Sequence, residues 1–388
     1  MRENRLNILF TKNLLIMVLL RPDLPPIDAV KDFMSPATPD YDRAEQLFIQ
    51  LLTTDNLDRQ VIAKQGKEDV KLAVQEFETA LETALAIAYT NRTTPEIENR
   101  FLQRILYRIN RLNFIWYKDL NEYTNERSLY VRWVHDRIEE PWQAWESAQL
   151  DLNLKNLSAT DIKAALIARG DVDLVPPISA NKRYLSHEMT LDSYRHLIAI
   201  VSLDGLVESS RLCHLLGGAS NEIQATLIRV LLEEYGNGRL SRKHSTFFAQ
   251  MMAELNLDST PEAYLDLVPW EVLASINHNF LLTQCKRNFL RYIGGFTYFE
   301  IVGPSVYQDY IAAAARLGLS ETAKGYWELH VKEDERHGQW MLHNACLPLV
   351  DMYPQHAWEL VLGYDQDKYM SGRAGDAIVK IIQNLTFN

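Results

Sequence analysis

The stretch that decides the fold is ETAKGYWELHVKEDERHGQWM, residues 321–341. Its residues His330, Asp334 and His337 follow the spacing i, i+4 and i+7, so they lie on one face of a helix. Trp327 lies on the same face, which indicates that this side is buried. Burying two imidazoles and a carboxylate is unfavourable unless they are paired or bind a metal. The pattern favours a metal site over the alternatives, a hydrogen-bonded buried network or an exposed charged face.

Helical periodicity also dominates the rest of the chain. The 388 residues include only 16 Gly and 14 Pro, and no series of alternating apolar and polar runs indicates a sheet. We therefore predict an all-α protein, with a helical arm over residues 1–115 ahead of a larger bundle. Expected helix starts are Thr93–Glu96, Ser158–Asp161, Ser259–Glu262 and Ser320; expected breaks are a kink at Pro141, a loop over Gly170–Asn181 and a helix end at Gly303–Pro304.

Composition excludes several classes of protein. The formal net charge of −11 weighs against a broad nucleic-acid-binding surface. Three scattered cysteines are too few for a disulfide framework or a thiolate metal site, which favours a reducing cytoplasm. The apolar run Leu14–Leu20 has no following cleavage site and is too short to span a bilayer, so we expect a packed helix there. We predict a cytoplasmic protein that binds neither nucleic acid nor membranes.

Further metal-ligand candidates precede the deciding stretch. Glu234 is expected to end a helix and His244 to begin the next, so the short connection brings them together. Glu208 and Glu300 lie on helices with apolar faces. A single glutamate is more often a surface residue, but four helices that each offer an inward carboxylate or imidazole are typical of a di-iron or di-manganese site in a bundle core. Oxygen-rich ligation with some imidazole suits iron or manganese better than zinc.

In order and residue type, this set resembles the ligands of the heme-oxygenase-like diiron oxidases and oxygenases. The set is Glu208, Glu234, His244, Glu300, His330, Asp334 and His337. The resemblance covers about residues 120–388 and is strongest to the N-oxygenase branch of natural product biosynthesis, the streptozotocin biosynthetic type. It implies a heme-oxygenase-like helical bundle over residues 116–388. By similarity of placement, it also implies that the arm over residues 1–115 mediates dimerisation, and hence a homodimer.

The resemblance also implies an activity. A non-heme diiron oxygenase would activate O2 and N-oxygenate an amine or guanidine nitrogen of an amino acid or a related small molecule. The implied cofactors are two Fe ions, with O2 as co-substrate and an external two-electron donor such as a ferredoxin-like protein. Glu234 matches the extra carboxylate that this branch associates with a longer-lived peroxo-diferric intermediate, and Glu233 could replace it in another helix register. The sequence ends at Asn388, so we do not expect the second, rearranging step of the cupin domain found in the streptozotocin type.

Three alternatives remain open at this point. The same site could desaturate, fragment or oxidatively decarboxylate an amino acid or a fatty acid; a pocket with paired charges favours the amino acid, an apolar tunnel the fatty acid. The protein could be a helical metal-binding scaffold without activity. A thiamin-salvage type of hydrolase would need a nucleophilic cysteine, and no recognisable motif places a base beside Cys213, Cys285 or Cys346.

Overall fold

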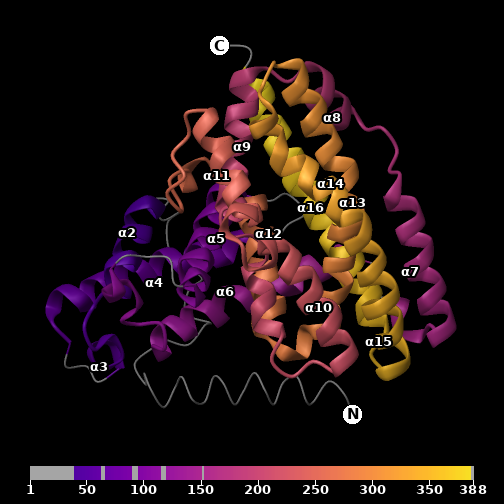
Figure 1. Ribbon diagram of the computed structural model, residues 1–388. Helices are drawn as coiled ribbons and strands as arrows, with labels where there is room; N and C mark the ends of the chain where they lie inside the picture. Colours follow the sequence, from indigo (N-terminus) through magenta and orange to yellow (C-terminus); the bar gives the residue numbers. More distant parts are fainter. Residues whose placement is uncertain (1–38, 63–65, 90–94, 115–118, 151–152, 386–388) are drawn as a thin grey trace. The chain divides into compact units, whose positions relative to one another are not determined.

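The computed structural model describes residues 39–62, 66–89, 95–114, 119–150 and 153–385 (Figure 1). All regular secondary structure in these ranges is helical, which confirms the predicted all-α class. The apolar run 14–20 lies outside the described residues. The chain forms two compact units, Met1–Gln143 and Ala144–Asn388. The dimerisation role of residues 1–115 stays a prediction.

The first unit is built on three mutually packed helices, α2 (Tyr41–Leu52), α4 (Glu68–Ala88) and α5 (Glu96–Asn110), with the short α3 (Leu57–Ile62) beside α4. Phe48 and Phe77 stack in its core with ring centroids 4.8 Å apart. The buried carboxylate of Glu45 accepts hydrogen bonds from the guanidinium groups of Arg104 and Arg108. Helix α6 (Leu129–Ser147) leads into the second unit, and Pro141 lies inside it without ending it.

The second unit is a helical bundle whose centre is α13 (Phe289–Arg316). Helix α13 packs along both α14 (Glu321–Trp340) and α16 (Trp358–Asn384), and these three long helices lie side by side (Figure 1). The surrounding helices are α7 (Ala159–Leu174), α9 (Leu191–Gly205), α10 (Asn221–Glu234), α11 (His244–Glu254) and α12 (Trp270–Gln284), with the 3-10 segment η6 (Glu208–Leu215) between α9 and α10. Two apolar clusters, around Ile293 and around Trp327, fill the interior.

Several predicted helix starts are confirmed. Helix α5 begins at Glu96 after Pro95. The Ser158 side chain accepts a hydrogen bond from the Asp161 amide in a capping box that opens α7. Ser320 caps α14, which continues through a π-helical turn, Met341–Cys346.

One expected break and one expected helix start were wrong, and the expected loop over 170–181 is shorter than predicted, each for a physical reason. Pro304 lies within α13, and its cost of about 3 kcal/mol or more is outweighed by packing along a largely buried helix. Residues 259–262 form a turn instead of a helix start, because Glu262 has a φ of 66° that no α-helix accommodates. Helix α7 continues past Gly170 to Leu174, since Asp173 accepts hydrogen bonds from Tyr364 and Lys368.

Within the described ranges, no helix has both the length and the apolar character needed to cross a lipid bilayer. The cytoplasmic localisation stays a prediction.

Candidate metal centre

Helix α14 supplies three polar side chains to the interior of the second unit. His330, Asp334 and His337 are 4%, 2% and 0% exposed, so the predicted buried face is confirmed. Aromatic packing holds this face inward: the Trp327 ring stacks on Tyr307 of α13 with centroids 5.4 Å apart. The burial of these groups leaves them dependent on partners inside the protein.

A tight turn brings Glu234 beside His244. Helix α10 ends at Glu234, and Gly236 follows with a φ of 60°. A Cβ at this glycine would lie 2.4 Å from the backbone carbonyl carbon of Arg242, so only glycine fits here. Helix α11 then begins at His244, whose Nδ1 lies 2.9 Å from Oε2 of Glu234.

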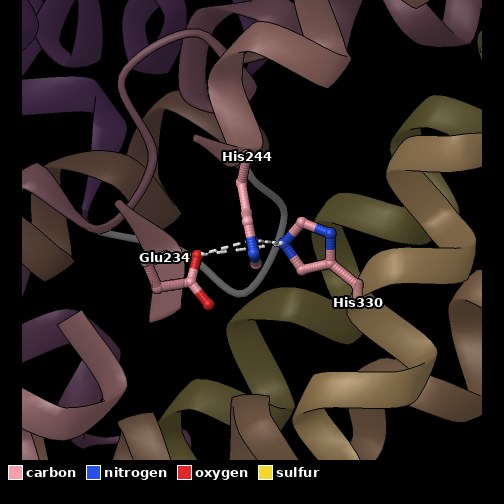
Figure 2. A group of neighbouring side chains, drawn as sticks. All are labelled: Glu234, His244 and His330. Atoms are coloured by element: carbon pink, nitrogen blue, oxygen red, sulfur yellow. Dashed lines mark hydrogen bonds and ion pairs between the residues drawn. The ribbon is translucent and has the colours of Figure 1, made fainter. Parts of the chain in front are cut away.

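Glu234, His244 and His330 form a first group of converging ligand atoms (Figure 2). His244 Nδ1 is 3.1 Å from His330 Nε2, and that nitrogen is 4.0 Å from Glu234 Oε2. The three residues come from α10, α11 and α14. One carboxylate and two imidazoles at these separations are a suitable donor set for one iron or manganese ion.

A second group surrounds Nδ1 of His337. This nitrogen lies 3.2 Å from Glu300 Oε2, 3.5 Å from Asp334 Oδ1 and 3.6 Å from Glu234 Oε1. Glu234 thus directs one carboxylate oxygen to each group. Helix α13 passes so close that a Cβ on Gly303 would lie 2.9 Å from Asp334 Oδ2.

Each imidazole is held by its outer nitrogen, which leaves the inner nitrogen directed at the carboxylates. The outer contacts are His244 Nε2 to Glu333 Oε2 (2.9 Å), His330 Nδ1 to the Tyr326 carbonyl (2.8 Å) and His337 Nε2 to Glu233 Oε2 (2.9 Å). Metal-binding histidines are held in this way by carboxylates or backbone carbonyls, which fix the tautomer and the ring orientation.

The charges of the cluster fit a bound cation. Burial, and then the nearby Asp334 carboxylate, raise the pKa of Glu300 to about 7, and burial also raises the pKa of Asp334. Burial disfavours the His337 imidazolium, yet the carboxylates around it raise its pKa to about 11. Both Asp334 oxygens and His337 Nδ1 are buried without a hydrogen bond. In the metal-free protein, bound protons therefore neutralise the negative charge of the inward carboxylates. Metal ions would neutralise that charge in place of the protons.

The structure brings six of the seven predicted residues together: Glu234, His244, Glu300, His330, Asp334 and His337. Glu208 begins η6, and its side chain lies outside the described residues. Glu233 does not replace Glu234 in the two inner groups but contacts the outer nitrogen of His337 and Arg336. Sequence reasoning missed Glu333, whose only signal was its position between His330 and Asp334.

A cavity of about 590 Å³ adjoins the cluster in the second unit, and Glu234, Glu300, His330 and Asp334 are among its lining residues. Its walls come from α9, α12, α13, α14 and α16. They are largely apolar, but they also carry charged side chains away from the cluster. These are Lys182, Asp204, Arg211, Asp309, Asp367 and Asp376. A cavity of this size can hold a small organic substrate beside the candidate metal ligands.

Residues 195–366, the segment that contains all the candidate ligands, match a haem-oxygenase-type family model described as iron-containing redox enzymes. This segment is therefore similar to iron-containing redox enzymes of the haem-oxygenase type. Nitrosourea synthase from Streptomyces achromogenes subsp. streptozoticus is 26% identical over 152 residues, which are 39% of this chain. The match spans about a third (32%) of that relative's length. The predicted all-α fold is confirmed, and the two matches support the predicted family and suggest an oxidoreductase.

Proposed function

We propose that this heme-oxygenase-like domain is a non-heme diiron oxygenase that N-oxygenates an amine or guanidine nitrogen. One iron would be held by Glu234, His244 and His330. The other would be held by Glu234, Glu300, Asp334 and His337. Glu208 is proposed as a seventh ligand, as its place in the predicted set implies.

The observation that carries the proposal is the position of Glu234 between the two groups. Its Oε2 faces His244 at 2.9 Å, and its Oε1 faces His337 at 3.6 Å. A carboxylate with one oxygen toward each donor set suits two neighbouring ions better than one. The burial of the three imidazoles and their fixed orientation support the same conclusion.

When bound, two iron ions would supply the reduction of O2 and the transfer of one oxygen atom. An amine N–H, O2, two electrons and two protons give N–OH and one water. The electrons come from an external donor, which we propose to be ferredoxin-like. The chain itself holds the inner imidazole nitrogens in place and encloses the substrate in a largely apolar cavity.

Charged groups in the cavity support an amino acid or a related amine over a fatty acid. Lys182 and Asp309 form an ion pair with N–O separation of 3.2 Å, and Arg211 pairs with Asp204. A tunnel for a fatty-acid chain would be lined mainly by apolar groups. The nitrosourea synthase relative supports nitrogen as the atom that is oxidised. Desaturation, fragmentation or decarboxylation of an amino acid on the same site is the second candidate.

Anaerobic titration with Fe(II), followed by exposure to O2 while visible absorption is recorded, tests the proposal. We expect two irons per chain and an oxygen-dependent band whose decay accelerates with the true substrate. His330→Ala and Asp334→Ala should each reduce iron loading, whereas His343→Ala, which removes an exposed histidine of the same region, should not. Full loading of both ligand variants would overturn the ligand assignment. Two bound irons that never react with O2 would favour the scaffold alternative.

The remaining parts of the proposal concern partners and place. We propose a homodimer that acts in the cytoplasm on a small-molecule amine or amino acid in natural product biosynthesis. Sedimentation velocity on the full chain measures the oligomeric state, and a mass of one chain would overturn the dimer.

A further inference from the structure

One carboxylate in the cavity beside the candidate centre is not neutralised by any cation of the described residues. Asp367 of α16 lines the cavity, and its carboxylate makes no hydrogen bond or ion pair with the residues that the structure describes. It packs against α13 at Gly295, where an added Cβ would lie 3.2 Å from Asp367 Cβ. Burial raises the pKa of this carboxyl to about 7, and no positive charge opposes that effect. Asp367 is only half-buried as a residue, but a carboxylate partly withdrawn from solvent without a partner is still unfavourable for folding.

The other acidic groups of the cavity wall differ from Asp367 in this respect. Outside the candidate metal ligands, each one among the described residues has a partner in the protein. Asp309 pairs with Lys182, Asp204 with Arg211, and Asp376 accepts a hydrogen bond from Asn181. Among these wall carboxylates, Asp367 is therefore the one that can pair with a bound molecule.

Tyr292 links Asp367 to the candidate centre. Tyr292 lines the same cavity, and its hydroxyl makes no hydrogen bond with the described residues. Burial raises the pKa of this phenol; the positive charge of Arg211 opposes that effect, and the negative charges of Glu300, Asp367 and Asp204 add to it. The phenol of Tyr292 therefore lies within electrostatic range of both Glu300, a candidate metal ligand, and Asp367.

We propose that Asp367 binds a cationic ammonium or guanidinium group of the substrate and so anchors it with its reacting end at the metal cluster. This inference rests on the proposed function and adds a substrate requirement to it. The substrate carries a positive group that does not react, in addition to the nitrogen that is oxidised. Tyr292 offers a hydrogen bond along the path between the two ends.

Isothermal titration of the full chain with L-arginine, L-lysine and agmatine tests this anchor, with L-citrulline as the neutral analogue of arginine. We expect at least one cationic probe to bind and citrulline to bind at least tenfold more weakly. Asp367→Asn should lower the affinity for the cationic probe by roughly tenfold or more, because a charge-assisted hydrogen bond is lost. Comparing the affinities for arginine and lysine shows whether the site requires a guanidinium or an ammonium group. Agmatine lacks the carboxylate of arginine, so its affinity shows whether that carboxylate contributes to binding.

Asp376→Asn is the matched control, since it also removes one negative charge from the cavity wall, but from a carboxylate that already accepts a hydrogen bond from Asn181. Affinity within about twofold of wild type is expected for this variant. Circular dichroism and thermal unfolding establish that both variants are folded. Equal binding by wild type and Asp367→Asn, or no binding of any cationic probe by wild type, would overturn the anchor. The titration needs no iron, so an intact anchor with failed iron loading would refute only the proposed oxygenase.

Discussion

Glu333 Oε2 lies 2.9 Å from His244 Nε2, the nitrogen of that imidazole that faces away from Glu234. The contact keeps the proton on the outer nitrogen, so the inner one carries a lone pair. We expect Glu333→Ala to weaken the binding of the iron held by Glu234, His244 and His330 by roughly 10–100-fold, as measured for other outer partners of metal-binding histidines. Anaerobic competition with a chelator measures this affinity. Glu335→Ala, on the exposed side of the same helix, should leave it unchanged; equal affinities in both variants would contradict the role of Glu333.

Gly303 keeps α13 close to the second group of ligands. An alanine Cβ at this position would lie 2.9 Å from Asp334 Oδ2 and 3.0 Å from a ring carbon of Tyr307. We expect Gly303→Ala to displace the Asp334 carboxylate and to reduce loading to about one iron per chain, measured by metal analysis after gel filtration. Gly372→Ala is the control, because a Cβ there meets nothing within 4 Å. Two irons in the Gly303 variant would show that the centre tolerates this shift.

Metal affinity should rise with pH. Glu300 and His337 must both lose protons to bind a metal. Burial raises the pKa of Glu300 to about 7. The carboxylates around His337 raise its pKa to about 11, against the effect of burial. Each released proton strengthens apparent binding by roughly tenfold per pH unit while its group is protonated in the metal-free chain. Titration with Co(II) at about pH 6 and pH 7.5, with proton release followed by an indicator dye, checks this. A flat profile would mean that neither residue is a ligand.

Asp367 should destabilise the fold at neutral and higher pH. Burial raises its pKa to about 7 from an ordinary value of 3.8, so its stabilising contribution is full below the ordinary value and is lost as pH rises through the folded value. We expect Asp367→Asn to raise the midpoint of thermal unfolding by a few degrees at about pH 8 and by little at about pH 4. Asp171→Asn, an exposed change, should be neutral at both. A lower midpoint at pH 8 would instead indicate a structural role.

The part of the centre that follows helical periodicity could be predicted from the sequence. His330, Asp334 and His337 share a helix, and the aromatic residues one turn earlier indicate which face is buried. The proximity of Glu234 and His244 follows from a glycine turn of fixed geometry. These features are local, so the order of residue types along the chain determines them.

Contacts between distant helices could not be predicted in this way. The pairing of Glu333 with His244 depends on how α14 packs against α11, and nothing in the spacing of charges reveals it. The continuation of α13 through Pro304 depends on packing against neighbouring helices, which local propensity does not include. The unpaired state of Asp367 is likewise visible only once the cavity is assembled.

The two oxygens of Glu234 face different halves of the proposed centre, which gives this one side chain a particular place in any attempt to redesign the protein. A change at His244 or at His337 removes a ligand from only one half and would leave the other metal position intact. A change at Glu234 acts on both halves at once. Loss of Glu234 would therefore remove a ligand from both proposed metal positions. A one-metal or mixed-metal variant of the protein would have to keep Glu234 unaltered.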